Sequence, residues 1–126
     1  MDRIIYMDNN ATTKVDEAVI EEMMPYLGQL YGNPSSMHNF GGQVAKKIQH
    51  ARSHVADLLG CDPDEIIFTS CGTESDNAVI RGTLATYPRK RKVITSRVEH
   101  PAVLSPCREL EHHGYLIHEL AVDKEG

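Results

Sequence analysis

Apolar residues recur at helical spacing in two long stretches of the chain. The first follows Asp16, a residue type that often caps a helix N-terminus. The second covers residues 43–59 and is ended by Gly60 and then Pro63. The apolar stripes are Val19, Ile20, Met23, Met24 and Leu27 in the first helix, and Val44, Ile48, Ala51, Val55, Leu58 and Leu59 in the second. We expect both stripes to face a core.

Short runs rich in β-branched residues predict strands. Residues 65–69 and 93–96 read as buried strands, and residues 115–120 predict a third. Residues 3–7 are a further candidate for a short strand. Each of these runs is bounded by turn-forming or polar residues.

Two more predicted helices lie between these strands. One continues over residues 78–85, with Thr73 or Ser75 available to cap it, and the other begins at Pro101 and ends near Gly114. The inward residues of the later helix are Val103, Leu104, Cys107 and Leu110. Because helix and strand alternate, the fold class predicted is α/β, with a mainly parallel sheet flanked by helices.

Residues 69–78, Thr-Ser-Cys-Gly-Thr-Glu-Ser-Asp-Asn-Ala, link a predicted strand to a predicted helix. The first N–H groups of a helix are unpaired, and the helix dipole favours negative charge beside them. Gly72 allows a ligand to approach the backbone closely, and the hydroxyls of Thr73 and Ser75 can add hydrogen bonds. An ordinary strand-to-helix turn capped by Ser and Thr is the alternative interpretation.

A second polar group follows the next predicted strand. Residues 99–100, Glu-His, come at its exit, just before Pro101. In parallel sheets, ligands bind at the carboxyl ends of the strands, where residues 70–73 also lie. A phosphate-binding turn and the imidazole of His100 are therefore expected to face one pocket.

Composition excludes several other classes of protein. With 126 residues, 40% apolar and 25% charged, the chain suits one globular domain, and its net charge of −5 argues against a general nucleic-acid binder. No apolar run approaches the roughly 20 residues of a membrane span, and no signal peptide pattern begins the chain, so we expect a cytoplasmic protein.

Cysteine and histidine counts do not predict a metal site. The three cysteines form no C-x-x-C pair, and the seven histidines are scattered. His50 and His54 have a metal-compatible spacing, but no acid or Cys close in sequence completes a site, so we read them as a surface pair.

Four segments occur in an order and spacing that resemble the N-terminal third of a NifS/IscS-type cysteine desulfurase. They are residues 8–13 (Asp-Asn-Asn-Ala-Thr-Thr), 31–38 (Tyr-Gly-Asn-Pro-Ser-Ser-Met-His), 68–77 (Phe-Thr-Ser-Cys-Gly-Thr-Glu-Ser-Asp-Asn) and 99–104 (Glu-His-Pro-Ala-Val-Leu). The forms of the last two resemble the NifS branch, which serves nitrogenase and nitrogen fixation. The resemblance extends over essentially the whole chain.

The resemblance implies a pyridoxal 5′-phosphate enzyme of the class V aminotransferase group, with the aspartate-aminotransferase-like three-layer fold. Such enzymes act as homodimers and release sulfur from L-cysteine as an enzyme persulfide, leaving L-alanine. An iron–sulfur scaffold protein is the implied sulfur acceptor, and neither nucleic acid nor membrane is an expected partner. Residues 1–30 are expected to pack with a small domain, and residues 31–126 to begin the large, cofactor-binding domain.

Site residues also follow from the resemblance. It implies that Gly72 and Thr73 hold the cofactor phosphate, and that His100 stacks on the pyridine ring and helps move protons. The residues implied for the substrate side of the pocket are Asn10, Ala11, Thr12 and Asn33.

Three parts of the family's machinery are not expected in this sequence: the Schiff-base lysine, the Asp at the pyridine nitrogen and the cysteine of the mobile loop. Cys71 is a possible sulfur acceptor, because a helix N-terminus lowers a thiol pKa, but the resemblance places it in the phosphate turn. Two alternatives therefore stay open. The chain could be a non-catalytic fragment or assembly subunit, or it could come from a selenocysteine lyase or another aminotransferase-like relative.

Overall fold

The computed structural model describes residues 4–125. The chain divides into two compact units, Met1–Ile66 (unit 1) and Ile67–Gly126 (unit 2). The boundary expected between residues 30 and 31 separates the small and the large domain of the aminotransferase-like fold. It stays a prediction.

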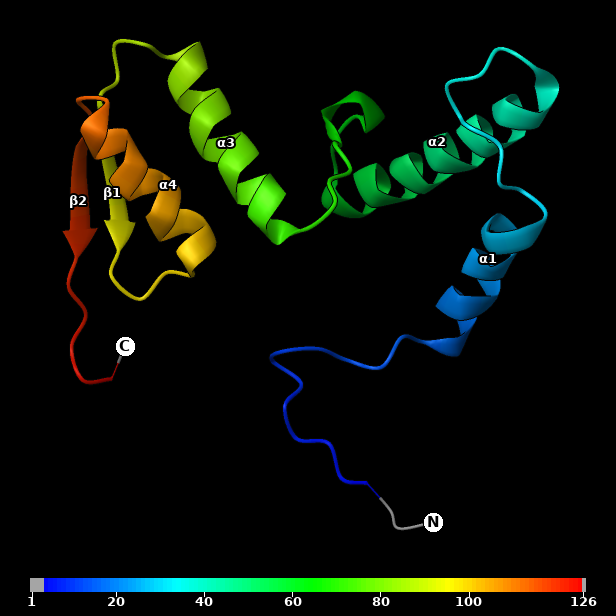
Figure 1. The fold of residues 1–126 in the computed structure, drawn as a ribbon, viewed down its shortest axis with the longest axis horizontal. Helices are drawn as coiled ribbons and strands as arrows, with labels where there is room; N and C mark the ends of the chain where they lie inside the picture. The colour runs from blue at the N-terminus through cyan, green and yellow to red at the C-terminus, as the bar shows by residue number, and fades with distance from the viewer. Residues whose placement is uncertain (1–3, 126) are drawn as a thin grey trace. The chain divides into compact units, whose positions relative to one another are not determined.

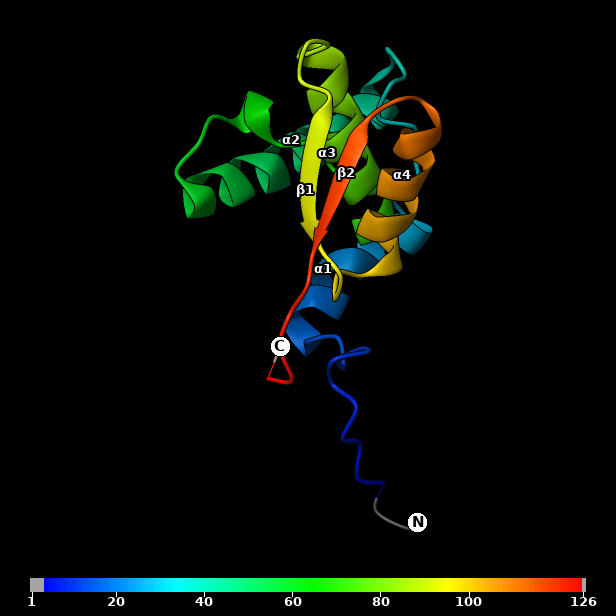
Figure 2. The ribbon, with the colours of Figure 1, turned by 90° about the vertical axis from the view of Figure 1, so that its left-hand side faces the viewer.

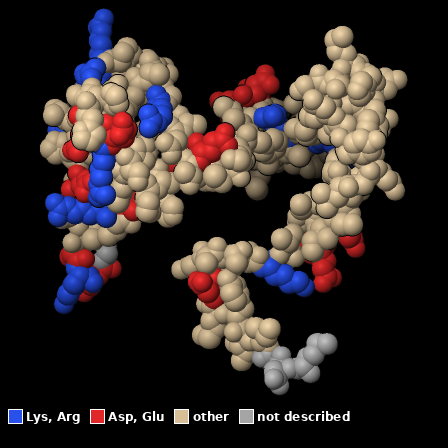
Figure 3. All heavy atoms as spheres, in the orientation of Figure 1, with Lys and Arg blue, Asp and Glu red and all other residues tan. Residues whose placement is uncertain are grey.

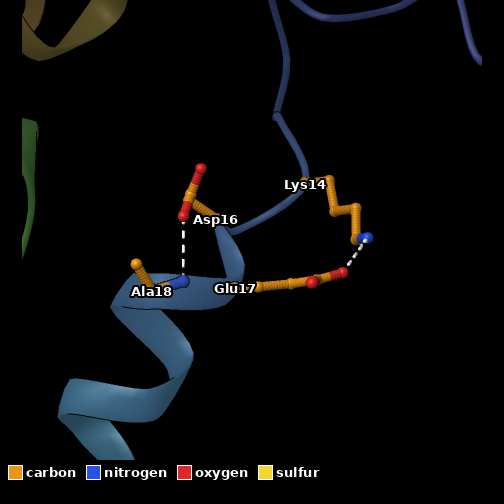
Figure 4. A network of polar contacts seen from close by, with 4 residues as sticks. All are labelled: Lys14, Asp16, Glu17 and Ala18. Carbon is orange, nitrogen blue, oxygen red and sulfur yellow. Dashed lines mark hydrogen bonds and ion pairs between the residues drawn. The ribbon is translucent and has the colours of Figure 1, made fainter.

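In unit 1, residues 4–16 form neither helix nor strand, and α1 (Glu17–Gly28) follows them. Asp16 caps α1 as predicted, since its carboxylate accepts a hydrogen bond of 2.9 Å from the N–H of Ala18, and Lys14 lies 3.5 Å from the Glu17 carboxylate (Figure 4). The apolar stripe of α1 is not buried, with Met24 57% exposed and Leu27 76% exposed. The expectation that this stripe faces a core is wrong for the described residues, because none of the described helices or strands of unit 1 covers it.

The second helix of unit 1, α2 (Asn39–Leu59), is longer than predicted by four residues at its start. It ends as expected at Gly60, which adopts the left-handed conformation with φ 71°. Its stripe is only partly covered: Val44 is buried, whereas Leu58 is 85% exposed. Ala56, which is not part of the predicted stripe, is also buried. The short 3₁₀ helix η1 (Pro63–Glu65) packs on α2, and the Arg52 guanidinium donates a hydrogen bond to the carbonyl of Ile66.

Two of the predicted strands are wrong in the described chain. Residues 4–7 form no strand and are exposed, and Arg3 of that prediction lies outside the described residues. Of residues 65–69, Glu65 ends η1 and residues 66–69 form no strand. A β-strand forms only when its backbone is hydrogen-bonded to a neighbouring strand. Within residues 4–125, neither segment pairs with a strand.

Unit 2 contains the sheet and the remaining helices, α3 (Gly72–Thr86) and α4 (Pro101–His112). Strands β1 (Lys92–Ser96) and β2 (Leu116–Leu120) pair in parallel, with Val93 opposite Ile117. Helix α4 connects the two strands and packs on β2, and α3 packs on α4, so both helices lie on one face of the sheet (Figures 1 and 2). This arrangement confirms the predicted α/β class with a parallel sheet.

The core of unit 2 lies under α4. Its buried apolar residues are Leu84, Ala102, Leu104, Cys107 and Leu110. Alternation along the strands places Val93 and Ile117 toward this core and leaves Ile94 and Leu116 on the uncovered face, 62% and 65% exposed. The core therefore fixes α4 on the sheet and, with it, the position of the residues at the start of α4.

Charged side chains of both signs are distributed over unit 2 on the face shown in Figure 3. Within residues 4–125, no helix combines the length and the apolar character needed to cross a bilayer.

Candidate functional site

The start of α3 carries the first half of the candidate site. The helix begins at Gly72, two to four residues before the start that a Thr73 or Ser75 cap would give, with Cys71 in extended conformation as its N-cap residue. The first hydrogen bond of the helix runs from the N–H of Ser75 to the carbonyl of Cys71, at 3.2 Å. The N–H groups of Gly72, Thr73 and Glu74 precede it and have no helical carbonyl to bond. They form the electropositive end of a helix of 15 residues.

The hydroxyls of Thr73 and Ser75 do not cap α3, so that part of the prediction is wrong. Both residues lie inside the first turn, and the Ser75 hydroxyl is 2.6 Å from the hydroxyl of Thr69. The carboxylate of Glu74 instead accepts hydrogen bonds of 2.7 Å from the N–H and the hydroxyl of Ser70. These two bonds lower the pKa of the Glu74 carboxyl, because they stabilise its charged form.

The lowered pKa of the Cys71 thiol indicates that the start of α3 stabilises negative charge. Cys71 is exposed and free, and its pKa is lowered chiefly by a hydrogen bond from the backbone N–H of Glu74, then by the Ser70 hydroxyl. The N–H of Thr73 adds a smaller effect in the same direction, whereas the charge of Glu74 opposes it. The backbone here therefore stabilises an anion, as predicted for a helix N-terminus.

His100 at the start of α4 carries the second half of the candidate site. It is the N-cap residue of α4, and its Nδ1 accepts a hydrogen bond of 3.1 Å from the N–H of Ala102. Since Nδ1 is the acceptor, the ring proton of the neutral imidazole is on Nε2. His38 caps α2 in the same way, through a bond of 3.2 Å from the N–H of Gly41.

The two halves of the site meet in one groove of unit 2, with a volume of about 520 Å³. Thr73 from the first turn of α3 and His100 from the cap of α4 both line it. The polar lining residues are Thr73, Asn77, Arg81, His100, Ser105 and Glu109. The candidate phosphate-binding turn (residues 70–73) and the imidazole of His100 were predicted to lie at the ends of neighbouring strands. In the structure, Thr73 of that turn and His100 line the same groove.

Asn77, Arg81 and Glu109 were not singled out from the sequence. A signal exists in their spacing, because Thr73, Asn77 and Arg81 lie four residues apart and so share one face of α3. That spacing alone does not show which face meets a groove, since the packing of α3 on α4 decides it.

The four residues predicted for the substrate side all lie in unit 1. Asn10, Ala11 and Thr12 are exposed, in a turn where the Asp8 carbonyl accepts bonds from the N–H groups of Ala11 and Thr12. Asn33 lies in a second turn, where its side-chain oxygen accepts a bond of 2.9 Å from the N–H of Ser35. Their role at a substrate pocket stays a prediction.

The helix start fits a phosphate group. Space is open beside Gly72, because a Cβ atom added there would meet no atom within 4 Å. The first N–H groups of α3, which have no helical carbonyl to bond, and the lowered pKa of Cys71 both suit an anion. None of the residues that line the groove is a lysine. Among the described residues, no cluster of His, Cys, Asp or Glu could hold a metal ion, and His50 and His54 are exposed, with ring centroids 4.1 Å apart.

Comparison with known proteins shows which family of proteins this chain belongs to. Residues 5–126 match the family described as aminotransferase class-V. A cysteine desulfurase of Nostoc sp. is 59% identical over 123 residues, which cover 98% of this chain and 31% of that protein. The cysteine desulfurase NifS of Azotobacter vinelandii is 51% identical and is covered to the same extent, 31%.

A solved structure described as a NifS-like protein has a similar fold. It superposes with a TM-score of 0.87 at 43% identity, over 92% of this chain and 32% of that chain. The chain belongs to the class V aminotransferase family, and its fold is the N-terminal part of the fold seen in NifS-like proteins. The chain spans about a third of the length of these relatives.

Proposed function

We propose that the complete protein is a pyridoxal-phosphate-dependent cysteine desulfurase. In this reaction the C–S bond of L-cysteine breaks, the sulfur passes to an enzyme thiol as a persulfide, and L-alanine leaves. The observation that carries the proposal is the shared groove, in which Thr73 of the phosphate-type turn and the capping imidazole of His100 both face the same space. The relatives named as cysteine desulfurases, 59% and 51% identical, support the choice of reaction within the family.

Each residue has a defined role in this proposal. The N–H groups of Gly72 and Thr73, with the Thr73 hydroxyl, bind the cofactor phosphate, because a helix N-terminus favours an anion. Nε2 of His100 holds and moves a proton beside the cofactor, while Nδ1 stays engaged with the N–H of Ala102. Pyridoxal phosphate, when bound, supplies the electron sink that lets bonds at the amino-acid carbon atoms break.

Substrate-side contacts are assigned to Asn10, Ala11, Thr12 and Asn33. Both turns that hold them are stabilised by backbone hydrogen bonds, and they present amide and hydroxyl groups suited to a polar amino acid. The lysine that binds the cofactor and the nucleophilic cysteine are assigned to parts of the polypeptide outside these 126 residues. Cys71 is not the proposed nucleophile, because it belongs to the phosphate turn.

The cellular setting forms the last part of the proposal. The desulfurase is a cytoplasmic homodimer that delivers sulfur to an iron–sulfur scaffold protein, in support of nitrogenase cluster assembly. The thiols of Cys61, Cys71 and Cys107 are all free, as suits a reducing compartment. The similarity to NifS supports the link to nitrogen fixation.

The proposal is tested with the complete gene product, supplied with pyridoxal phosphate and L-cysteine. We expect alanine and, with a reductant, sulfide in equal amounts. Selenocysteine assayed in parallel distinguishes a selenocysteine lyase, which would turn over selenocysteine and leave cysteine unchanged. Intact mass under native and denaturing conditions completes the test. If only a 14.1 kDa species were found and no alanine formed, the non-catalytic alternative would replace the proposal.

A further inference from the structure

Asn77 connects the two helix starts that form the candidate site. Its side-chain Nδ2 donates a hydrogen bond of 2.9 Å to the carbonyl of Thr73, one turn earlier on α3. The same Nδ2 donates to the carbonyl of Ala102 on α4, at 3.5 Å. Asn77 is half-buried and lines the same groove as Thr73 and His100.

These bonds continue to His100. Ala102 accepts from Asn77 through its carbonyl and donates through its N–H to Nδ1 of His100, at 3.1 Å. Three consecutive hydrogen bonds therefore run from the backbone of Thr73, through Asn77 and Ala102, to the imidazole. The path crosses from α3 to α4 only at the Asn77 amide.

The chemistry of the side chain at position 77 is specific. A primary amide nitrogen carries two hydrogens, and each is directed to one of the two carbonyl oxygens. A serine hydroxyl has one hydrogen and bonds back to the carbonyl four residues earlier, as Thr86 does here to Gly82 at 2.9 Å. An aspartate matches the shape of Asn77 but has no N–H, so it places an acceptor against two acceptors.

We propose that Asn77 is a positioning residue, which sets the His100 imidazole relative to the phosphate-binding turn through its bonds to Thr73 and Ala102. The proposal depends on the function proposed above, because the distance between these two groups matters only to a ligand that contacts both. A cofactor with a phosphate at one end and an aromatic ring at the other is such a ligand.

The test uses the complete gene product as apo-protein, with pyridoxal 5′-phosphate as the probe. The variants are Asn77→Ser, which keeps the bond to Thr73 and loses the bond to Ala102, and Asn77→Asp, which loses both. Thr86→Val is the matched control, since it removes a side-chain bond to a carbonyl within α3 and leaves the link to α4 intact. The readouts are the dissociation constant of the cofactor, the visible circular dichroism of the bound cofactor and the urea midpoint.

We expect Asn77→Ser to weaken cofactor binding about three- to tenfold and to change the visible dichroism. Asn77→Asp should do both to a greater extent. Thr86→Val should lower the urea midpoint comparably and leave binding and dichroism unchanged. Either Asn77 variant that folds is sufficient for the comparison.

Two outcomes would overturn the inference. If the Asn77 variants lose stability but bind the cofactor as the wild-type protein does, with the same dichroism, Asn77 is only structural and the proposed function is unaffected. If the wild-type protein itself binds no pyridoxal phosphate, the proposed function fails and this inference fails with it.

Discussion

Nδ1 of His100 accepts a hydrogen bond of 3.1 Å from the backbone N–H of Ala102, so His100 caps α4 while its Nε2 stays available to a ligand. One ring thus has a structural bond at one nitrogen and a chemical role proposed for the other. From the sequence, His100 is expected to contribute little to stability because it lies at the end of a strand. The cap changes that expectation, since removing a capping side chain costs about 1 kcal/mol.

The two roles of His100 can be separated by substitution. Asparagine is a favoured N-cap residue, so His100→Asn should keep most of the stability that His100→Ala loses, about 1 kcal/mol. Both variants should lose most turnover, because neither has an imidazole. Urea unfolding and alanine production by the complete protein measure the two effects. His38→Ala calibrates the value of the same cap in α2. High turnover in the folded His100→Asn protein would show that the ring does no chemistry.

The helices were predictable because their signals are local. Asp16, Gly60 and Pro101 mark the beginning of α1, the end of α2 and the beginning of α4, as expected from capping and turn preferences. The start of α3 was predicted too late, because Cys71 is not among the favoured N-cap residues and the hydroxyls nearby suggested a later cap. Local chemistry thus predicted the helices and misplaced the starts of α2 and α3.

Non-local packing accounts for the other differences. The apolar segment 65–69 has the composition of a strand but forms none, since pairing depends on a neighbour that its own residues do not specify. Thr73 and His100, which line one groove, were recognisable as candidate site residues from motif and strand order. Asn77 was not, because its importance depends on how α3 packs against α4.

Cys71 and Cys107 should differ strongly in reactivity. The pKa of the Cys71 thiol is lowered by backbone N–H groups and by Ser70, whereas burial, followed by the charge of Glu119, raises the pKa of Cys107. At neutral pH more of Cys71 is therefore thiolate, and it is also exposed. Iodoacetamide labelling, followed by mass spectrometry across pH 6 to 9, should modify Cys71 before Cys107. The labelling rate of Cys71 should also reach its plateau at a lower pH than that of Cys107.

Ser70→Ala is the informative variant for Cys71, because it removes the second-largest cause of the lowered pKa. It should move the labelling profile of Cys71 to higher pH and leave that of Cys107 in place. Equal labelling of the two thiols in the folded wild-type protein would contradict the assignment.

Glu74 should make part of the stability of α3 dependent on pH. Its carboxylate accepts two bonds from Ser70, which hold its pKa below the ordinary value of 4.5. A lowered pKa in the folded state stabilises the fold above the unfolded pKa, and this contribution is lost as pH falls through the folded pKa. The difference in urea midpoint between wild type and Glu74→Gln should therefore be largest at neutral pH and shrink below 4.5. Glu111→Gln, at an exposed glutamate of α4, serves as the control.

Two adjacent glycines of α2 should respond to alanine with opposite signs. A Cβ added to Gly41 would overlap the carbonyl oxygen of Asn33 and lie 2.9 Å from Cβ of Ser36, whereas at Gly42 it would meet nothing within 4 Å. Gly42→Ala should stabilise the protein by about 0.5–1 kcal/mol, the usual gain of alanine over glycine in a helix. Gly41→Ala should destabilise it by about 1–3 kcal/mol, because backbone must move to make room.

The pair also tests the turn that presents Asn33. If the turn is held against α2 as the structure shows, only Gly41→Ala should displace it, and the KM for L-cysteine should rise in that variant alone. Urea unfolding and steady-state kinetics of both variants provide the comparison. Stabilisation by both alanines would mean that residues 33–36 do not rest on α2, and the assignment of Asn33 to the substrate side would lose its structural support.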